Sequence, residues 1–258
     1  MIRPVELLPL PGIPLVRAGD DLAALIGAAL ERAALTLRPG DVVVVAQKIV
    51  SKAEGRLVHL DDVRPGSEAE ALAAETGKDP RLVQLILDES VAVVRKRRGT
   101  PERPGVIIVE HRCGWVHANA GIDQSNLDED ACALLLPVDC DASAASLRDA
   151  LGTLTGTRPG VVVADSAGRA WRVGTVGMAL GAAGVETVQD LRGQPDLQGR
   201  ILEVTVVGRG DELAAAAGLV MGQACEAVPA VLVRGLPAFD GTATARELIR
   251  PGAEDMFR

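Results

Sequence analysis

Residues 41–56 read D-V-V-V-V-A-Q-K-I-V-S-K-A-E-G-R, an apolar run that passes directly into a polar one. The four valines are β-branched and form a run short enough for one strand that is buried on both faces. Gln47 and Lys48 follow this strand at once, where open sheets present groups to a ligand. On a helix, Lys48 and Lys52 would share a face and could reach one polyphosphate, with a solvated basic face as the alternative.

Two further stretches combine small residues with oxygen-bearing side chains. Residues 115–126 read W-V-H-A-N-A-G-I-D-Q-S-N, and residues 160–169 read G-V-V-V-A-D-S-A-G-R. Small residues let a ligand approach the backbone, while carboxylate, hydroxyl and amide groups suit a hard cation or a phosphate. We therefore expect Asp123 and Asp165 to hold Mg²⁺ against phosphate oxygens. Polar turns in which these acids cap a helix are the alternative.

Hydrophobic periodicity and turn residues predict the other elements. We expect helices over 22–35, 67–88 (restarting at Asp79-Pro80), 127–136, 143–151 and 211–224, and strands over 5–14, 91–94, 106–110, 135–139, 201–207 and 230–234. The prolines in the first strand favour an edge position or an extended segment that lines a ligand.

Two glycine-rich segments need separate treatment. Residues 174–184 do not match the G-x-G-x-x-G spacing, so they predict either close packing of backbones or a flexible loop that faces a ligand. Gly208 and Gly210 stand at the first turn of a βαβ-like unit expected over 201–234. Leu213 occupies the place of the third glycine, which makes a Rossmann interpretation weak, and no P-loop motif occurs in the sequence.

Composition excludes several classes of partner. The net charge of −8, from 27 basic and 35 acidic side chains, argues against nucleic acid or an anionic membrane surface. The chain has two Trp, two Phe and no Tyr, so it lacks stacking platforms for single strands. Four scattered cysteines without a C-x-x-C pair suit reduced thiols, and no apolar run approaches a membrane span. We expect a cytoplasmic protein.

Several motifs occur in a fixed order along almost the whole chain. They are L-P-G-I-P at 10–14, A-Q-K-I-V-S-K-A-E-G-R at 46–56, N-A-G-I-D-Q-S-N at 119–126, L-P-V-D at 136–139, V-A-D-S-A-G-R-A-W-R at 163–172, A-A-A-A-G-L-V-M-G-Q at 214–223 and R-P-G-A-E-D-M-F at 250–257. Together they resemble the coenzyme F420 γ-glutamyl ligases. The chain departs from that family's common pattern at Ser166, where Thr is frequent, and at Cys140, where Pro is frequent; the first change keeps the hydroxyl oxygen.

The resemblance implies a GTP-dependent ligase that adds L-glutamate to the phospholactyl carboxylate of coenzyme F420-0, and then adds further γ-linked glutamate. An acyl phosphate is the implied intermediate, with release of GDP and phosphate. The resemblance also implies Mg²⁺ or Mn²⁺, with two ions, and a homodimer. The implied fold is α+β, with mixed sheets and flanking helices, and is neither a Rossmann nor a P-loop fold. Residues 1–258 are expected to form one unit, with two closely packed lobes as the alternative, and without a fused nitroreductase-like domain.

The resemblance also assigns site residues. Catalytic roles fall to Asp123, Asp165 and Lys52; metal binding to Asp123, Asp165, Ser166 and Gln223; and GTP binding to Ile13, Pro14, Leu15, Val16, Gln47, Lys52 and Asn126. Phosphoryl transfer depends mostly on positioning and charge neutralisation, so no protein nucleophile is required. Arg169 and Arg172 could hold a substrate carboxylate or phosphate, or could form structural salt bridges.

Three other functions compete with this hypothesis. A ligase or kinase with a different acceptor would use the same groups. A GTP-binding sensor without catalytic activity would bind the nucleotide and not turn it over. A nicotinamide oxidoreductase built on Gly208 and Gly210 would bind a dinucleotide.

Overall fold

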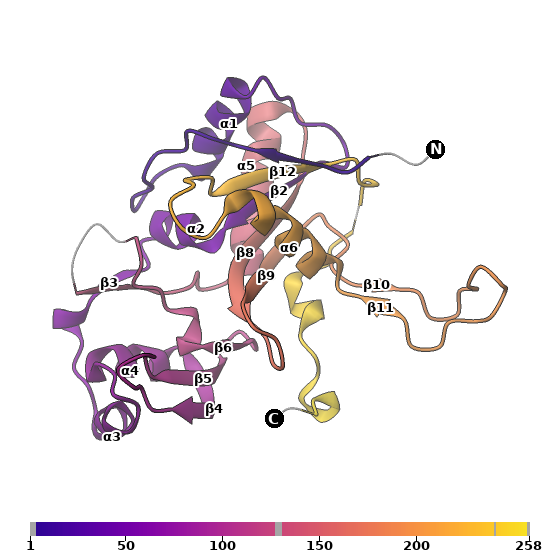
Figure 1. Ribbon diagram of the computed structural model, residues 1–258. Helices are drawn as coiled ribbons and strands as arrows, with labels where there is room; N and C mark the ends of the chain where they lie inside the picture. Colours follow the sequence, from indigo (N-terminus) through magenta and orange to yellow (C-terminus); the bar gives the residue numbers. More distant parts are fainter. Residues whose placement is uncertain (1–3, 127–130, 240, 257–258) are drawn as a thin grey trace.

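A mixed five-stranded sheet forms the centre of the computed structural model, which describes residues 4–126, 131–239 and 241–256 (Figure 1). Its strands, in spatial order, are β1 (Glu6–Pro9), β12 (Ala230–Arg234), β2 (Val42–Ala46), β8 (Gly160–Gly168) and β9 (Thr175–Ala183). Only β2 and β8 run parallel, and the other neighbours are antiparallel. The proline-bearing strand β1 lies at the edge, as predicted.

Helices cover both faces of this sheet. The helices α1 (Leu22–Arg32), α2 (Gln47–Ala53) and α5 (Cys140–Thr155) lie on one face, and α6 (Arg209–Met221) lies on the other. The valine run of β2 explains the layering, because alternate side chains of a strand point to opposite faces. Val43 and Val45 pack in the core with α1, α2 and α5, whereas Val42 and Val44 pack in the core with α6. The predicted doubly buried strand is confirmed, and so is the α+β class.

Most of the glycine-rich stretch 174–184 forms the strand β9 (Thr175–Ala183), not a loop. A Cβ on Gly177 would lie 2.2 Å from the Ala214 carbonyl oxygen of α6, and one on Gly181 would lie 2.1 Å from the Cys140 carbonyl oxygen of α5. Backbone close packing is therefore the reason for the glycines. A register shift opposite Val163 and Ala164 inserts one extra residue, Leu180, into β9, which is why two glycines four apart face different helices.

The chain between α2 and α5 forms a second body with its own hydrophobic core; we call residues 57–134 the insertion. It contains α3 (Ser67–Thr76), α4 (Pro80–Asp88), the three-stranded sheet β4 (Ser90–Arg97), β5 (Val106–His111) and β6 (Val116–Ala118), and the pair β3 (Leu57–His59) and β7 (Cys132–Leu134). Strand β6 packs beside β8 of the large sheet. The insertion thereby brings residues near 117–126 to the ends of β2 and β8 (Figure 1).

A buried charge network joins the insertion to the large sheet region. The Glu89 side chain is 7% exposed. Its Oε2 lies 2.9 Å from Arg112 Nη2, and its Oε1 lies 3.2 Å from Arg56 Nη2. Arg56 also donates to the Leu136 carbonyl oxygen at 2.8 Å. Burial alone would raise the pKa of Glu89, but the neighbouring His111, Arg56 and Arg112 hold that pKa below its ordinary value.

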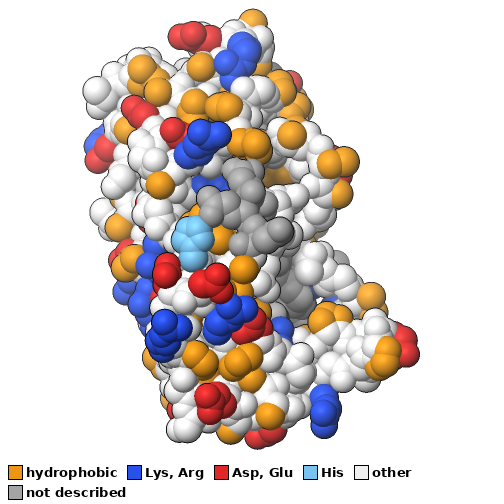
Figure 2. All heavy atoms as spheres, turned by 90° about the vertical axis from the view of Figure 1, so that its left-hand side faces the viewer, with side chains coloured by type: hydrophobic (Ala, Val, Ile, Leu, Met, Phe, Trp, Pro, Cys, Tyr) orange, Lys and Arg blue, Asp and Glu red, His pale blue; other side chains and the backbone are white. Residues whose placement is uncertain are grey.

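Figure 2 shows the face that lies on the left-hand side of Figure 1, and the surface charges on this face are mixed. There, acidic and basic side chains are interspersed, with apolar side chains scattered among them (Figure 2). Among the described residues this face therefore carries no single-sign patch, and the net charge of the chain is −8. No helix within the described ranges is long and apolar enough to cross a membrane.

Several predicted elements differ from the structure. The helix expected over 127–136 is wrong for 132–134, which form β7, while residues 127–130 lie outside the described residues. The strand expected over 135–139 is absent from this described stretch. The buried run Cys132–Leu134 pairs with β3, and periodicity cannot separate such a short apolar run from a helix.

The βαβ-like unit over 201–234 is also wrong. Within 201–207 only β11 (Val206–Val207) is a strand, and it pairs with β10 (Gln189–Asp190) outside the large sheet. Strand β12 runs antiparallel to both of its neighbours. The short helical turns η1 (Leu60–Asp62), η2 (Asn119–Gly121), η3 (Ala245–Leu248) and η4 (Gly252–Glu254) complete the elements.

Candidate functional site

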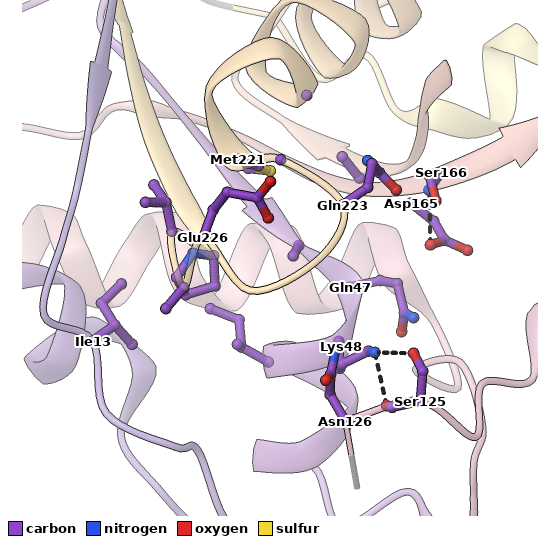
Figure 3. Close-up of a pocket in the computed structure, with 18 of the residues that line it drawn as sticks. Ile13, Gln47, Lys48, Ser125, Asn126, Asp165, Ser166, Met221, Gln223 and Glu226 are labelled. Atoms are coloured by element: carbon purple, nitrogen blue, oxygen red, sulfur yellow. Dashed lines mark hydrogen bonds between the residues drawn. The ribbon is translucent and has the colours of Figure 1, made fainter. Parts of the chain in front are cut away.

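A cavity of about 450 Å³ lies where the parallel strands β2 and β8 end (Figure 3). Six separate segments form its walls. They are the stretch 13–16, residues 46–52 around the start of α2, the turn 123–126, residues 164–166 of β8, Gly177 of β9, and the second half of α6 with the loop 222–229 that follows it. The structure brings every residue assigned to the site by resemblance to this one cavity: Ile13, Pro14, Leu15, Val16, Gln47, Lys52, Asp123, Asn126, Asp165, Ser166 and Gln223.

Helix α2 begins directly after β2 and supplies one wall. Gln47, at its first turn, is only 3% exposed, and its Oε1 accepts a hydrogen bond from Ser51 Oγ at 2.8 Å. Lys48 and Lys52 project from the same side of the helix toward the turn 123–126. The prediction that these lysines share a face is confirmed. Neither is merely solvated, because Lys52 Nζ donates to the Asn126 carbonyl oxygen at 3.0 Å and Lys48 Nζ donates to the Ser125 carbonyl oxygen at 2.9 Å.

Asp123 is held by the protein itself. Its Oδ2 lies 2.7 Å from Lys48 Nζ, and its Oδ1 accepts from the Ser125 backbone N–H at 2.7 Å. Burial would raise the pKa of Asp123, but the hydrogen bonds from Lys48 and Ser125 hold it below its ordinary value. The backbone of Asp123 forms a bridge with Leu134, which fixes the turn against β7. Asp123 is therefore an ionised carboxylate with one lysine as its counter-charge.

Asp165 has a different environment, on β8 directly after the last residue that pairs with β2. Its Oδ1 accepts from the Ser166 backbone N–H at 2.8 Å. Burial raises the pKa of Asp165, and the nearby negative charge of Asp123 raises it further, against a lowering effect of His117. The charges of Asp123 and Asp165 therefore interact across one site.

His117 is a neighbour of this site that the sequence interpretation missed. It lies on β6 of the insertion, and its Nε2 is 3.5 Å from Asp165 Oδ2. That nitrogen is buried and makes no hydrogen bond among the described residues. His117 stands within the 115–126 stretch, but a single histidine without ligand spacing is not a signal that sequence reasoning can use.

The loop after α6 closes the cavity opposite Lys48 and contributes residues that were assigned no role. Gly222 has a φ of 72°, which turns the chain sharply at the helix end. Glu226 folds back into this loop, where its Oε2 accepts from the Ala224 backbone N–H at 2.8 Å. Met221 and Glu226 line the cavity together with Gln223 (Figure 3).

The donor set fits a divalent cation. The carboxylates of Asp123 and Asp165, the hydroxyl of Ser166 and the amide of Gln223 line one cavity. These are hard oxygen ligands, and Mg²⁺ needs only one or two protein carboxylates beside waters and phosphate oxygens. The buried Nε2 of His117, which lies 3.5 Å from Asp165 Oδ2, is a further polar atom at this position without a hydrogen bond among the described residues. Among the described residues, no three or more His, Cys, Asp or Glu side chains form a group that could hold a metal alone.

Arg169 and Arg172 lie elsewhere. Both are exposed, in and beside the connection between β8 and β9, and neither lines the cavity. The structure therefore does not place them where they could clamp a substrate bound there.

The protein is an α+β protein with a cavity, lined by charged and apolar side chains, beside the end of its parallel strand pair. The chain belongs to the F420-0:γ-glutamyl ligase family, whose model matches residues 12–235. It is 47% identical over 258 residues to the coenzyme F420:L-glutamate ligase of Methanopyrus kandleri, with 98% of both chains covered. It is 46% identical over 258 residues to the enzyme of the same name from Methanothermobacter thermautotrophicus, covering 98% of this chain and 99% of the relative. The motif-based family prediction is confirmed, and the protein is a member of a ligase family.

Proposed function

We propose that this protein adds L-glutamate to the phospholactyl carboxylate of coenzyme F420-0 at the expense of GTP, and then adds further γ-linked glutamate. The relatives named coenzyme F420:L-glutamate ligase support the acceptor and the amino acid. The observation that supports phosphoryl chemistry is the convergence of Asp123, Asp165, Lys48 and Lys52 on one cavity.

The proposed reaction has two steps. A carboxylate oxygen of F420-0 attacks the γ-phosphorus of GTP, so that an acyl phosphate forms and GDP leaves. The amine of glutamate then attacks the acyl carbon, an amide bond forms, the amine loses a proton, and inorganic phosphate leaves. Both steps need stabilisation of negative charge on phosphate oxygens more than they need a protein nucleophile.

The cavity residues supply that stabilisation in the proposal. Lys48 and Lys52 lie four residues apart on α2 and offer two ammonium groups to the phosphates. Asp123, Asp165, Ser166 and Gln223 would hold Mg²⁺ or Mn²⁺, with two ions proposed. When bound, the cation neutralises phosphate charge and orients the triphosphate.

The rest of the cavity suits the nucleoside. Ile13 and Val16 are buried and anchor their segment, while Leu15 is 71% exposed beside the cavity. A large apolar side chain left exposed at a cavity wall is suited to cover a base or a ribose. Gln47 and Asn126 also line the cavity and offer amide groups (Figure 3).

A homodimer is part of the proposal. The arm that carries β10 and β11 projects away from the large sheet (Figure 1). Leu197 and Val204 on this arm are 107% and 86% exposed, and Val206 is 47% exposed. Exposed apolar side chains on one element favour an interface with another chain. Light scattering of the wild type should give the mass of a dimer. The double variant Leu197→Glu with Val204→Glu should have a mass closer to that of the monomer. A monomeric mass for the wild type would reject the homodimer.

The main test is a reconstituted reaction. The protein is incubated with F420-0, L-glutamate, Mg²⁺ and GTP, and the products are followed by mass spectrometry with assays for GDP and phosphate. We expect F420-0 to gain the mass of one glutamate residue, followed by further additions, with one GDP for each. ATP in place of GTP is the control for the nucleotide. GTP binding without any glutamate product would reject the proposed ligation and favour the sensor function.

A further inference from the structure

Lys48 and Lys52 are one helical turn apart, yet they bind different chemical groups. Lys48 Nζ lies 2.7 Å from Asp123 Oδ2, and it also donates to the Ser125 carbonyl oxygen at 2.9 Å and to Ser125 Oγ at 3.0 Å. Lys52 Nζ donates to a neutral group, the Asn126 carbonyl oxygen, at 3.0 Å. Only Lys48 is therefore paired with a carboxylate that the proposed function gives to a cation.

The pair is partly withdrawn from water. The side chains of Lys48 and Asp123 are 24% and 28% exposed. At such a site an ion pair is stronger than on an open surface, because solvent screens it less. An incoming divalent cation that uses Asp123 must compete with the ammonium group and is repelled by its charge.

The same geometry gives Lys48 another partner once a nucleotide is present. Lys48 lines the cavity, and its ammonium points to the side on which Ser125 lies (Figure 3). A triphosphate bound there would offer several anionic oxygens within reach of the flexible four-carbon stem. The ammonium can then leave Asp123 and pair with a phosphate oxygen, so that it keeps an anionic partner.

We propose that Lys48 acts as a resident counter-ion which occupies Asp123 in the absence of metal and nucleotide, and which thereby couples the binding of the divalent cation to the binding of the nucleotide. The inference rests on the proposed function, because it assumes that Asp123 takes part in cation binding. Lys48 weakens binding of the cation alone and strengthens binding of the nucleotide. By linkage, the nucleotide raises cation affinity by the same factor as the cation raises nucleotide affinity.

The test measures Mn²⁺ affinity by electron paramagnetic resonance, first with MnCl₂ alone and then with a non-hydrolysable GTP analogue present. In the Lys48→Met variant, which keeps a similar apolar stem, Mn²⁺ alone should bind roughly ten-fold more tightly than in the wild type. The analogue should bind more weakly, and the coupling factor should fall by a similar amount. Some coupling should remain, since cation and phosphates also contact each other directly.

Two matched variants control for general disturbance of the site. Lys48→Arg keeps the charge, so Mn²⁺ alone should bind as weakly as in the wild type. Lys52→Met removes a neighbouring lysine that holds no carboxylate; it should weaken binding of the analogue without tightening binding of Mn²⁺ alone. Circular dichroism checks that each variant is folded.

The outcomes separate this inference from the proposed function. Tighter Mn²⁺ binding in Lys48→Met only, with reduced coupling, supports the inference. Unchanged or weaker Mn²⁺ binding in Lys48→Met overturns it, and if the wild type still ligates glutamate, the proposed function is unaffected. Absence of Mn²⁺ binding to the wild type overturns the inference together with the metal part of the proposed function.

Discussion

Three acidic residues of this protein differ in how much positive charge the chain supplies to them. Glu89, in the junction between the insertion and the large sheet, has Arg56, Arg112 and His111 around it. Asp123, on the turn at the cavity, has the single lysine Lys48. Asp165, on β8, has no lysine or arginine in an ion pair among the described residues; His117 Nε2 lies 3.5 Å from its Oδ2 and makes no hydrogen bond within the described ranges.

The series indicates which acid serves structure and which serves chemistry. A buried carboxylate is costly unless it is neutralised, so a chain that leaves one without a full partner is expected to gain a positive charge from a ligand. Glu89 is satisfied by the protein, Asp165 is not, and Asp123 is intermediate. Loss of Glu89 should therefore affect stability, and loss of Asp165 should affect activity.

The largest effect is expected for Asp165→Asn. Glutamate ligation should fall by roughly a thousand-fold or more, because the amide removes the charge that would hold a cation beside the phosphates. The thermal midpoint should not fall, since an uncharged side chain is easier to bury. Kinetic assays and thermal unfolding would be measured on the same preparation. Unfolding of the variant at ordinary temperature would favour a structural role and break the comparison.

A smaller but still large loss is expected for Asp123→Asn. Ligation should fall by roughly a hundred-fold, because the cation loses one ligand while Lys48 becomes free to bind phosphate. The Michaelis constant for GTP should change less than kcat. Steady-state kinetics at several Mg²⁺ concentrations would test this. A loss as great as that of Asp165→Asn, unaffected by Mg²⁺, would contradict the intermediate position of Asp123.

Glu89→Gln should lower the free energy of unfolding at pH 7 by about 2 to 3 kcal/mol, because the guanidinium groups of Arg56 and Arg112 lose their counter-charge. The pKa of Glu89 is lowered in the folded protein, so its contribution is present above the unfolded pKa of about 4.3 and is lost as the pH falls through the folded pKa. The difference in the free energy of unfolding between the wild type and Glu89→Gln, measured with urea, should therefore be smaller at about pH 3 than at about pH 5. An equal difference in the free energy of unfolding at both pH values would contradict the pairing of Glu89 with these arginines.

The smallest effect is expected for His117→Ala. Because the imidazole Nε2 lies 3.5 Å from Asp165 Oδ2, its loss should weaken Mn²⁺ binding by roughly ten-fold, as for other groups that support a metal ligand. His59→Ala, at a histidine whose Nδ1 contacts Cys132 Sγ, is the matched control. Titration calorimetry with MnCl₂ would measure both. Equal affinities in the two variants would remove His117 from the comparison.

Much of the fold and of the candidate site could be predicted, but not all of it. The β-branched runs at 42–45 and 161–163 became buried strands, and the polar residues after each run line the cavity. Strand β9 could not be predicted, because its glycines are explained by helices that approach it from both sides. Strand β7 could not be predicted either, because its partner β3 is far away in the sequence.

The sequence by itself determined the local features. A run of valines specifies a strand wherever it occurs, because branching at Cβ restricts the side chain, and motif order specified the family. Only the tertiary structure decided which charges meet. Lys48 reaches a turn 77 residues further along the chain, and His117 comes to Asp165 from another sheet. Such contacts depend on how the insertion packs against the large sheet, and a local sequence pattern does not specify that packing.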